Sequence, residues 1–221
     1  MDITPFVQTV AIYALPVLFA ITLHEAAHGY VARHFGDLTA HAQGRISLNP
    51  LRHIDPVGTL FVPLAILLAT KLFGGAGMLF GWAKPVPVNY SALRRPRQNM
   101  LWVAAAGPAA NLAMALGWAA LFKAVELAPE NYFSHPLRLM AGAGMEVNLV
   151  LMLLNLLPIL PLDGGRILAS LLPARLAWGY AKLEPWGFPI LLLLLLTSTL
   201  GLILAPMLDF SFRVLGTVFQ I

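Results

Sequence analysis

Apolar residues gather in five runs along this chain, and polar loops separate the runs. The runs cover residues 5–32, 57–73, 99–122, 139–161 and 187–205, and a short apolar tail continues to Ile221. Because about 20 apolar residues suffice to cross a bilayer as a helix, the pattern predicts an all-α polytopic membrane protein. The run 57–73 contains Pro63 and Lys71, and a glycine-rich stretch follows it. We therefore expect this segment to be re-entrant or part of a hairpin.

The composition agrees with this interpretation. Hydrophobic residues make up 59% of the 221 residues and charged residues only 11%, against about 25% charged residues in soluble domains. The spans use nearly the whole chain, so we expect one integral-membrane domain over residues 1–221, with its core in about 5–170 and an accessory C-terminal span in about 187–221. The absence of cysteine excludes disulfides and thiolate zinc ligands.

The stretch His24-Glu25-Ala26-Ala27-His28 lies near the end of the first run. Residues i and i+4 share a helix face, so both imidazoles can bind one metal ion. Glu25 would lie beside that metal and could accept a proton from the attacking water. Ionisable side chains inside a span cost ~2.5–3.5 kcal/mol each on insertion scales and usually mark function. The stretch therefore indicates a catalytic metal site rather than a buried polar cluster without metal.

A catalytic zinc usually has three protein ligands, so the histidine pair needs a partner. Without cysteine that partner must be His, Asp or Glu, and Asp163 is the best candidate. It follows Pro158 and Pro161, which end a helix, and precedes Gly164 and Gly165. A carboxylate on such a turn can point back into the protein, although Asp163 could also merely stabilise the turn.

The predicted topology tests this pairing. If the third run leaves the membrane face at which the first run ends, the fourth run returns to that face, and Asp163 ends beside His28. Residues 33–98 must then begin and end on the same side, so 57–73 must turn back or cross together with 74–90.

The charges assign that face to the cytoplasm. Residues 33–97 hold eight Lys and Arg, and residues 162–186 hold three. The opposite loop, 123–138, has two, balanced by two Glu. By the positive-inside rule, the predicted site lies towards the cytoplasmic side. The same rule accounts for the net charge of +4, and we expect no nucleic-acid partner.

Four stretches of the chain resemble the site-2 protease family of intramembrane zinc metalloproteases. They are residues 24–28 (HEAAH), 81–88 (GWAKPVPV), 106–111 (AGPAAN) and 155–165 (NLLPILPLDGG). The resemblance implies a three-helix catalytic core with one Zn²⁺ held by His24, His28 and Asp163. It further implies that Glu25 is the general base and that Asn155 contacts the substrate carbonyl.

The resemblance also covers the stretch Lys84, Pro85, Val86, Pro87 and Val88. This stretch is similar to a short extended strand that clamps an extended substrate by edge pairing. No span precedes the histidine pair and no PDZ insert is present, so the chain looks like the minimal subgroup without a PDZ domain. The expected substrates are transmembrane-helix proteins within the bilayer of a prokaryotic inner or plasma membrane, and the oligomeric state is open.

Two other functions compete with the protease. One is a catalytically silent relative that binds membrane partners, against which the intact Glu25 argues. The other is a metal-ion transporter, because ionisable residues within spans also mark ion pathways.

Several residues have a purely structural interpretation. The stretch 84–88 could be a passive linker. Asn111 is expected to bond a neighbouring helix. His41 and His53 lie in a polar loop and are expected at the surface. The Arg94, Arg95 and Arg97 cluster is expected to anchor the topology at anionic lipid.

Overall fold

The computed structural model describes residues 4–53, 55–61 and 84–221, and all regular elements in these ranges are helical. The longer helices are α1 (Thr4–His34), α4 (Pro96–Leu127), α5 (Ser134–Asn155), α6 (Asp163–Leu171), α7 (Ala174–Ala181), α8 (Glu184–Leu196) and α9 (Thr199–Phe219). The short ones are α2 (Thr39–Ala42), η1 (Pro50–Arg52), the π-helical η2 (Pro56–Phe61) and η3 (Tyr90–Ala92).

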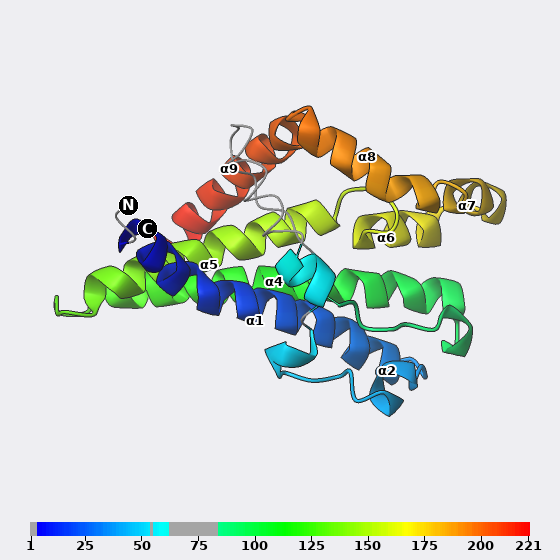
Figure 1. Cartoon of the computed structure of the whole chain (residues 1–221), viewed down its shortest axis with the longest axis horizontal. Helices are drawn as coiled ribbons and strands as arrows, with labels where there is room; N and C mark the ends of the chain where they lie inside the picture. The colour runs from blue at the N-terminus through cyan, green and yellow to red at the C-terminus, as the bar shows by residue number, and fades with distance from the viewer. Residues whose placement is uncertain (1–3, 54, 62–83) are drawn as a thin grey trace.

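Three long helices lie side by side and form the body of the protein. Helices α1 and α5 run in the same direction and α4 runs between them in the opposite one, as Figure 1 shows. The predicted parity is therefore correct, because α1 and α5 end at the same face. Helices α1 (from Val7), α4, α5 and α9 are each long and apolar enough to cross a membrane.

Apolar packing joins α4 and α5 to the C-terminal α9. The cluster contains Ala115 and Ala119 of α4, Leu149 of α5 and Leu204 of α9. Small residues allow the close approach expected between membrane helices. A Cβ atom on Gly144 of α5 would lie 2.3 Å from the indole ring of a tryptophan on α4, so only glycine fits at that crossing.

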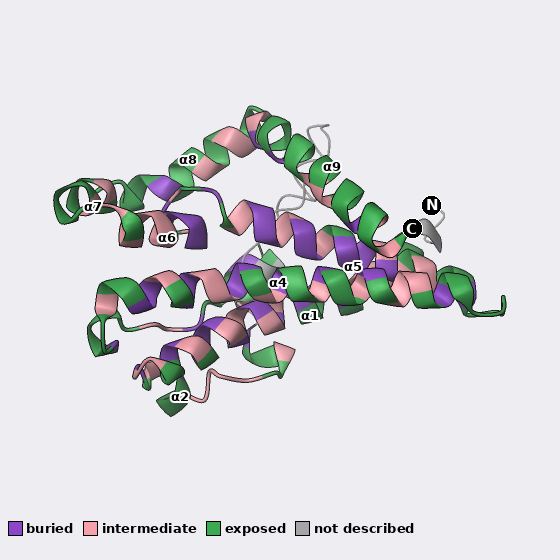
Figure 2. Cartoon of the chain, turned by 180° about the vertical axis from the view of Figure 1, so that it is seen from behind, coloured by how far each residue is buried: buried purple, intermediate pink, exposed green. Residues whose placement is uncertain are grey.

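The last apolar run, 187–205, was expected to be one span, and this expectation is wrong. The run is divided at Thr197 and Ser198 between α8 and α9. Ser198 has φ 58°, in the left-handed region that a right-handed helix cannot continue through. Helix α8 forms a bent pair with α7, at 62°, which makes a fifth candidate span. Most residues of α8 and α9 are exposed, as Figure 2 shows.

No strand occurs among the described residues, so the strand predicted at 84–88 is not found as a regular element. The physical reason is local: Pro85 and Pro87 have no N–H, and the N–H of Val86 bonds a side chain instead of another strand. The predicted re-entrant segment 57–73 lies mostly outside the described residues.

Candidate metal centre

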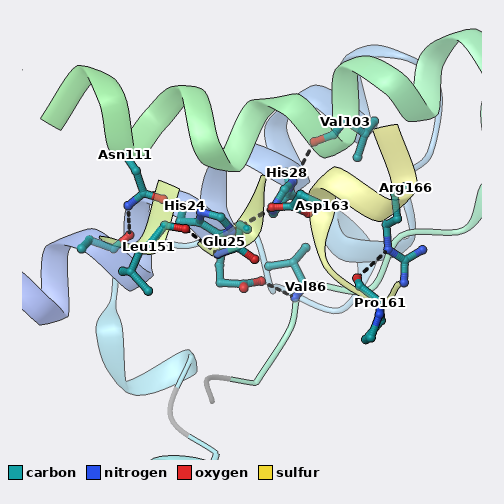
Figure 3. A network of polar contacts seen from close by, with 12 residues as sticks. His24, Glu25, His28, Val86, Val103, Asn111, Leu151, Pro161, Asp163 and Arg166 are labelled. Atoms are coloured by element: carbon teal, nitrogen blue, oxygen red, sulfur yellow. Dashed lines mark hydrogen bonds and ion pairs between the residues drawn. The ribbon is translucent and has the colours of Figure 1, made fainter. Parts of the chain in front are cut away.

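The two histidines and Asp163 converge on one point, as Figure 3 shows. The Nε2 atoms of His24 and His28 lie 3.1 Å apart. One carboxylate oxygen of Asp163, Oδ2, lies 3.2 Å from the first and 3.3 Å from the second. All three residues are buried. The sequence therefore predicted this juxtaposition correctly, across 135 or more residues of chain.

A diglycine brings Asp163 into place. Helix α5 ends at Asn155, and Asp163 is the first residue of α6. A Cβ on Gly164 would lie 2.2 Å from the carbonyl oxygen of Leu156, and one on Gly165 would lie 2.6 Å from a backbone atom of Ile159. Because both glycines touch the preceding turn backbone to backbone, α6 starts tightly against it and its first side chain points back to α1.

Gly107 makes the corresponding room on α4. A Cβ at this position would lie 2.4 Å from Nε2 of His28 and 2.5 Å from Cε1 of His24. No side chain larger than hydrogen fits there without moving the imidazoles. The glycine thus lets α4 pass directly over the histidine pair.

Acceptors on α4 fix the tautomer of both histidines. His24 Nδ1 lies 2.6 Å from Oδ1 of Asn111, and His28 Nδ1 lies 2.7 Å from the carbonyl oxygen of Val103. Since these oxygens only accept, each Nδ1 carries the hydrogen and donates it. The lone pair of each Nε2 is then available to a metal ion, as metal-binding histidines require.

Asn111 also ties the helices together. Its amide donates to Oδ1 of Asn148 on α5 at 3.0 Å, and Asn148 donates to the Gly144 carbonyl at 2.8 Å. The expected structural role of Asn111 is confirmed but incomplete, because the same residue orients His24. Its spacing of four residues from Gly107 places both residues on one face of α4, but the sequence does not specify that this face turns towards the histidines.

The three facing atoms form a set that fits a cation. Two unprotonated ring nitrogens and a carboxylate oxygen face one another at 3.1–3.3 Å. Oδ2 of Asp163 is buried and has no hydrogen-bond partner among the described residues. Three acceptors without a donor repel each other in a buried site unless a positive charge lies between them. Two imidazoles and a carboxylate are a known ligand set of catalytic zinc.

Comparisons with known proteins agree with this chemistry. The model of "Peptidase family M50" matches residues 122–198. YwhC of Bacillus subtilis (strain 168), which is named as an inferred zinc metalloprotease, is 37% identical over 213 residues, 93% of this chain and 91% of that protein. The chain belongs to peptidase family M50.

Further relatives come from mycobacteria. Rip2 of Mycolicibacterium smegmatis, also named as an inferred zinc metalloprotease, is 31% identical over 83% of this chain and 66% of that protein. Rip2 of Mycobacterium tuberculosis (strain H37Rv) is 29% identical over the same shares. No solved structure matches the chain. This M50 protein is thus a multi-pass membrane zinc metalloprotease with bacterial relatives, and its cluster of His24, His28 and Asp163 fits the zinc site.

Beside this M50 cluster, Glu25 makes a contact that the sequence did not indicate. Its half-buried carboxylate accepts the backbone N–H of Val86 at 2.7 Å. The guanidinium of Arg45 donates to the carbonyl oxygens of Lys84 and Pro85 at 2.9 Å and 3.3 Å. The stretch 84–88 is therefore tied to the site, which argues against a passive linker.

Asn155 shows no such tie to the zinc ligands. Its amide donates to the Leu151 carbonyl of its own helix at 3.0 Å, and its side chain is half-buried. The role that the family resemblance gives it stays a prediction.

In the polar loop, His53 is not where the sequence predicted it. His53, expected at the surface, is 2% exposed. Its Nε2 lies 2.8 Å from the Ser47 carbonyl, and its own carbonyl accepts the N–H of Lys84 at 2.9 Å. Loop polarity suggested exposure, but this histidine is buried because it links two loop segments.

Proposed function

We propose that this M50 protease cleaves a peptide bond within or near a transmembrane segment of other membrane proteins, with Glu25 as the general base. One observation carries the proposal. The Nε2 atoms of two buried imidazoles and a buried carboxylate oxygen face one another as acceptors, next to a half-buried glutamate on a membrane-length helix. Such a set beside a membrane-length helix has little structural use without a cation, because unpaired acceptors there are costly.

The chain's own residues divide the reaction between them. His24, His28 and Asp163 would hold Zn²⁺, which when bound polarises the scissile carbonyl and makes its water more acidic. Glu25 accepts the proton of the attacking water and passes it to the leaving amine. Asn111 and Val103 keep the imidazoles in the tautomer that leaves Nε2 free. Asn155 would donate to the substrate carbonyl from the end of α5.

The substrate must be extended at the cut site, because helical peptide bonds are shielded by their own helix. Residues 84–88 would hold it by edge pairing. The three-helix core of α1, α4 and α5, together with the start of α6 that carries Asp163, then contains the chemistry within one domain. The excess of Lys and Arg in 33–97 supports a site open towards the cytoplasm of a bacterial inner membrane.

The experiment compares Glu25→Gln with Glu146→Gln. Glu146 is also a glutamate on a membrane-length helix, but it is exposed on α5 and accepts the hydroxyl of Tyr13. In cells that produce each variant or the wild type, fragments of membrane proteins are measured by mass spectrometry. Each protein is then purified, and its bound zinc is measured by elemental analysis. A purified 30-residue Ala/Leu peptide with Asn-Gly near one end and Lys at both ends serves as the defined substrate.

We expect Glu25→Gln to bind zinc and to lose cleavage by roughly 10²–10⁴-fold, since that is the usual contribution of a general base. Glu146→Gln should cleave like the wild type. Cleavage by Glu25→Gln at the wild-type rate would overturn the assignment. Metal flux into proteoliposomes that persists in Glu25→Gln would favour the transporter instead.

A further inference from the structure

Only one edge of the stretch 84–88 carries backbone N–H donors that can pair with a substrate. In extended backbone, alternate residues direct their N–H and C=O groups to opposite sides. Lys84 and Val86 each precede a proline and are thereby restricted to extended conformations. Pro85 and Pro87 have no N–H, so the donors for edge pairing come from Lys84, Val86 and Val88 alone.

Partners from the protein already occupy that edge. The N–H of Lys84 donates to the His53 carbonyl at 2.9 Å, and its carbonyl accepts from Arg45 at 2.9 Å. The N–H of Val86 donates to Glu25 at 2.7 Å, as Figure 3 shows. A substrate backbone that pairs at Val86 must therefore compete with the general base for one hydrogen.

The stretch is fixed where this competition takes place. The side chain of Val86 is buried and lies within 3.3 Å of the position that a Cβ on Gly29 would take on α1. At the far end, the N–H of Asn89 donates to the buried carboxylate of Asp37 at 2.6 Å. The donor of Val86 thus has a defined place beside Glu25, the residue that follows His24 on α1.

We propose that the N–H of Val86 is a shared donor that couples substrate binding to the release of the general base. Without substrate it binds the carboxylate of Glu25. An extended substrate takes this N–H with a backbone carbonyl, and Glu25 is then free to accept the proton of the attacking water. The proposal rests on the function proposed above and assigns Val86 as the residue that makes the base available only when a peptide is in place.

The exchange has a chemical consequence for the substrate. The bond from N–H to a carboxylate is charge-assisted and stronger than a bond to a neutral carbonyl. A single carbonyl therefore cannot displace Glu25 alone. The substrate must bring further contacts along an extended stretch, which selects segments that unwind over several residues.

The first test measures hydrogen exchange of the Val86 amide in Glu25→Ala, which cannot cleave. Because residues 85 and 87 are prolines, Val86 has the one exchangeable backbone amide of that tripeptide. We expect slow exchange in the wild type, fast exchange in Glu25→Ala, and slow exchange again when the 30-residue Ala/Leu peptide is added to Glu25→Ala. The readout does not depend on activity. Fast exchange in the presence of peptide would overturn the proposal.

The second test replaces the donor and keeps the extended backbone. Val86→Pro removes the N–H between two existing prolines, and Val86→Ala keeps it as the matched control. We expect Val86→Pro to lower KM for the peptide about 3- to 10-fold, because the substrate no longer has to replace the stronger bond to Glu25 by a bond to a neutral carbonyl, and to leave kcat within about twofold. Val86→Ala should show a smaller change in KM. A lower kcat with unchanged KM in Val86→Pro would mean that the N–H only orients Glu25, which contradicts the proposal.

The two proposals fail in different ways. If the wild type cleaves neither the peptide nor any membrane protein in cells, the proposed protease function fails and this inference fails with it. If the wild type cleaves the peptide but the peptide does not protect Val86 in Glu25→Ala, only the shared donor is wrong.

Discussion

The polar network beside the histidines in the three-helix body differs from the polar side chains of α9, the last helix of the C-terminal arm α7–α9. In the body, polar groups bond between helices, as Asn111 does with His24 on α1 and Asn148 on α5. In α9, Ser211 and Thr217 each donate to a carbonyl of their own helix, four residues back. Bonds between helices fix rotation and register, whereas bonds within one helix fix neither.

The glycines next to the candidate site differ in the same way from Gly201 of α9. In the body and at the start of α6, a Cβ on Gly107 or Gly164 would lie under 2.5 Å from a histidine or a carbonyl oxygen. In α9, a Cβ on Gly201 would have nothing within 4 Å. The body is therefore built to place particular atoms, while most of the arm fits against it through apolar contacts that tolerate change.

Removing a zinc ligand should separate the two regions most clearly. We expect Asp163→Asn to lose roughly 100-fold or more in zinc affinity, because one of the three proposed ligands loses its charge, whereas loss of a partner behind a ligand usually costs about 10–100-fold. Asp209→Asn removes an exposed carboxylate from α9 and should keep about one zinc per chain. Elemental analysis of the purified variants measures both. Equal zinc content in the two variants would mean that Asp163 is not a ligand.

The next effect comes from Gly107→Ala. The added methyl group must displace His24 or His28, so we expect zinc loss and a free energy of unfolding lowered by about 1–3 kcal/mol, as for other overpacked sites. Gly117→Ala, on the same helix, has nothing within 4 Å and should be neutral or stabilising by up to ~1 kcal/mol. Zinc analysis and thermal unfolding in detergent compare them. A stable, zinc-bound Gly107→Ala would show that α4 lies farther from the histidines.

A smaller loss should follow from Asn111→Ala. His24 loses the acceptor that holds its Nδ1 hydrogen, and removal of such a partner usually lowers metal affinity about 10–100-fold. Asn155→Ala is the matched control, because that amide bonds its own helix, and we expect wild-type zinc affinity with a reduced kcat. Competition with a chelator measures the affinity. If Asn155→Ala bound zinc more weakly than Asn111→Ala, Asn155 rather than Asn111 would be the residue that supports zinc binding.

These residues also show how far the sequence alone could go. His24, His28 and Asp163 could be predicted because helical periodicity and the number of crossings place them at one membrane face. The contact between Asn111 and His24 could not, because it depends on the rotation of α4 about its axis, which hydrophobicity does not specify. The helix break at Ser198 could not be predicted either, because two polar residues, Thr197 and Ser198, are too few to interrupt the pattern of an apolar run.

The burial of His53 and the bond between Val86 and Glu25 both involve the stretch 84–88, which is distant in sequence from His53 and Glu25 and has no helical periodicity of its own. A sequence pattern identified the proline-rich stretch, but the strand predicted there is not found among the described residues. The pattern could not show that Glu25 is the partner of its central donor.

The smallest expected effect on zinc affinity concerns a close backbone contact between the arm and the turn that precedes Asp163. A Cβ on Gly187 of α8 would lie 1.5 Å from the carbonyl oxygen of Leu160, three residues before Asp163. Gly187→Ala must move α8 away from this turn, and we expect a free energy of unfolding lowered by about 1–3 kcal/mol. Zinc affinity should fall less than in Asn111→Ala, because Gly164 and Gly165 still hold the start of α6. Gly201→Ala, with open space around it, should change neither quantity. If Gly187→Ala matches Gly201→Ala in thermal unfolding and zinc affinity, α8 does not rest on the turn. If it instead loses zinc as Gly107→Ala does, the arm belongs to the site as fully as the three-helix body.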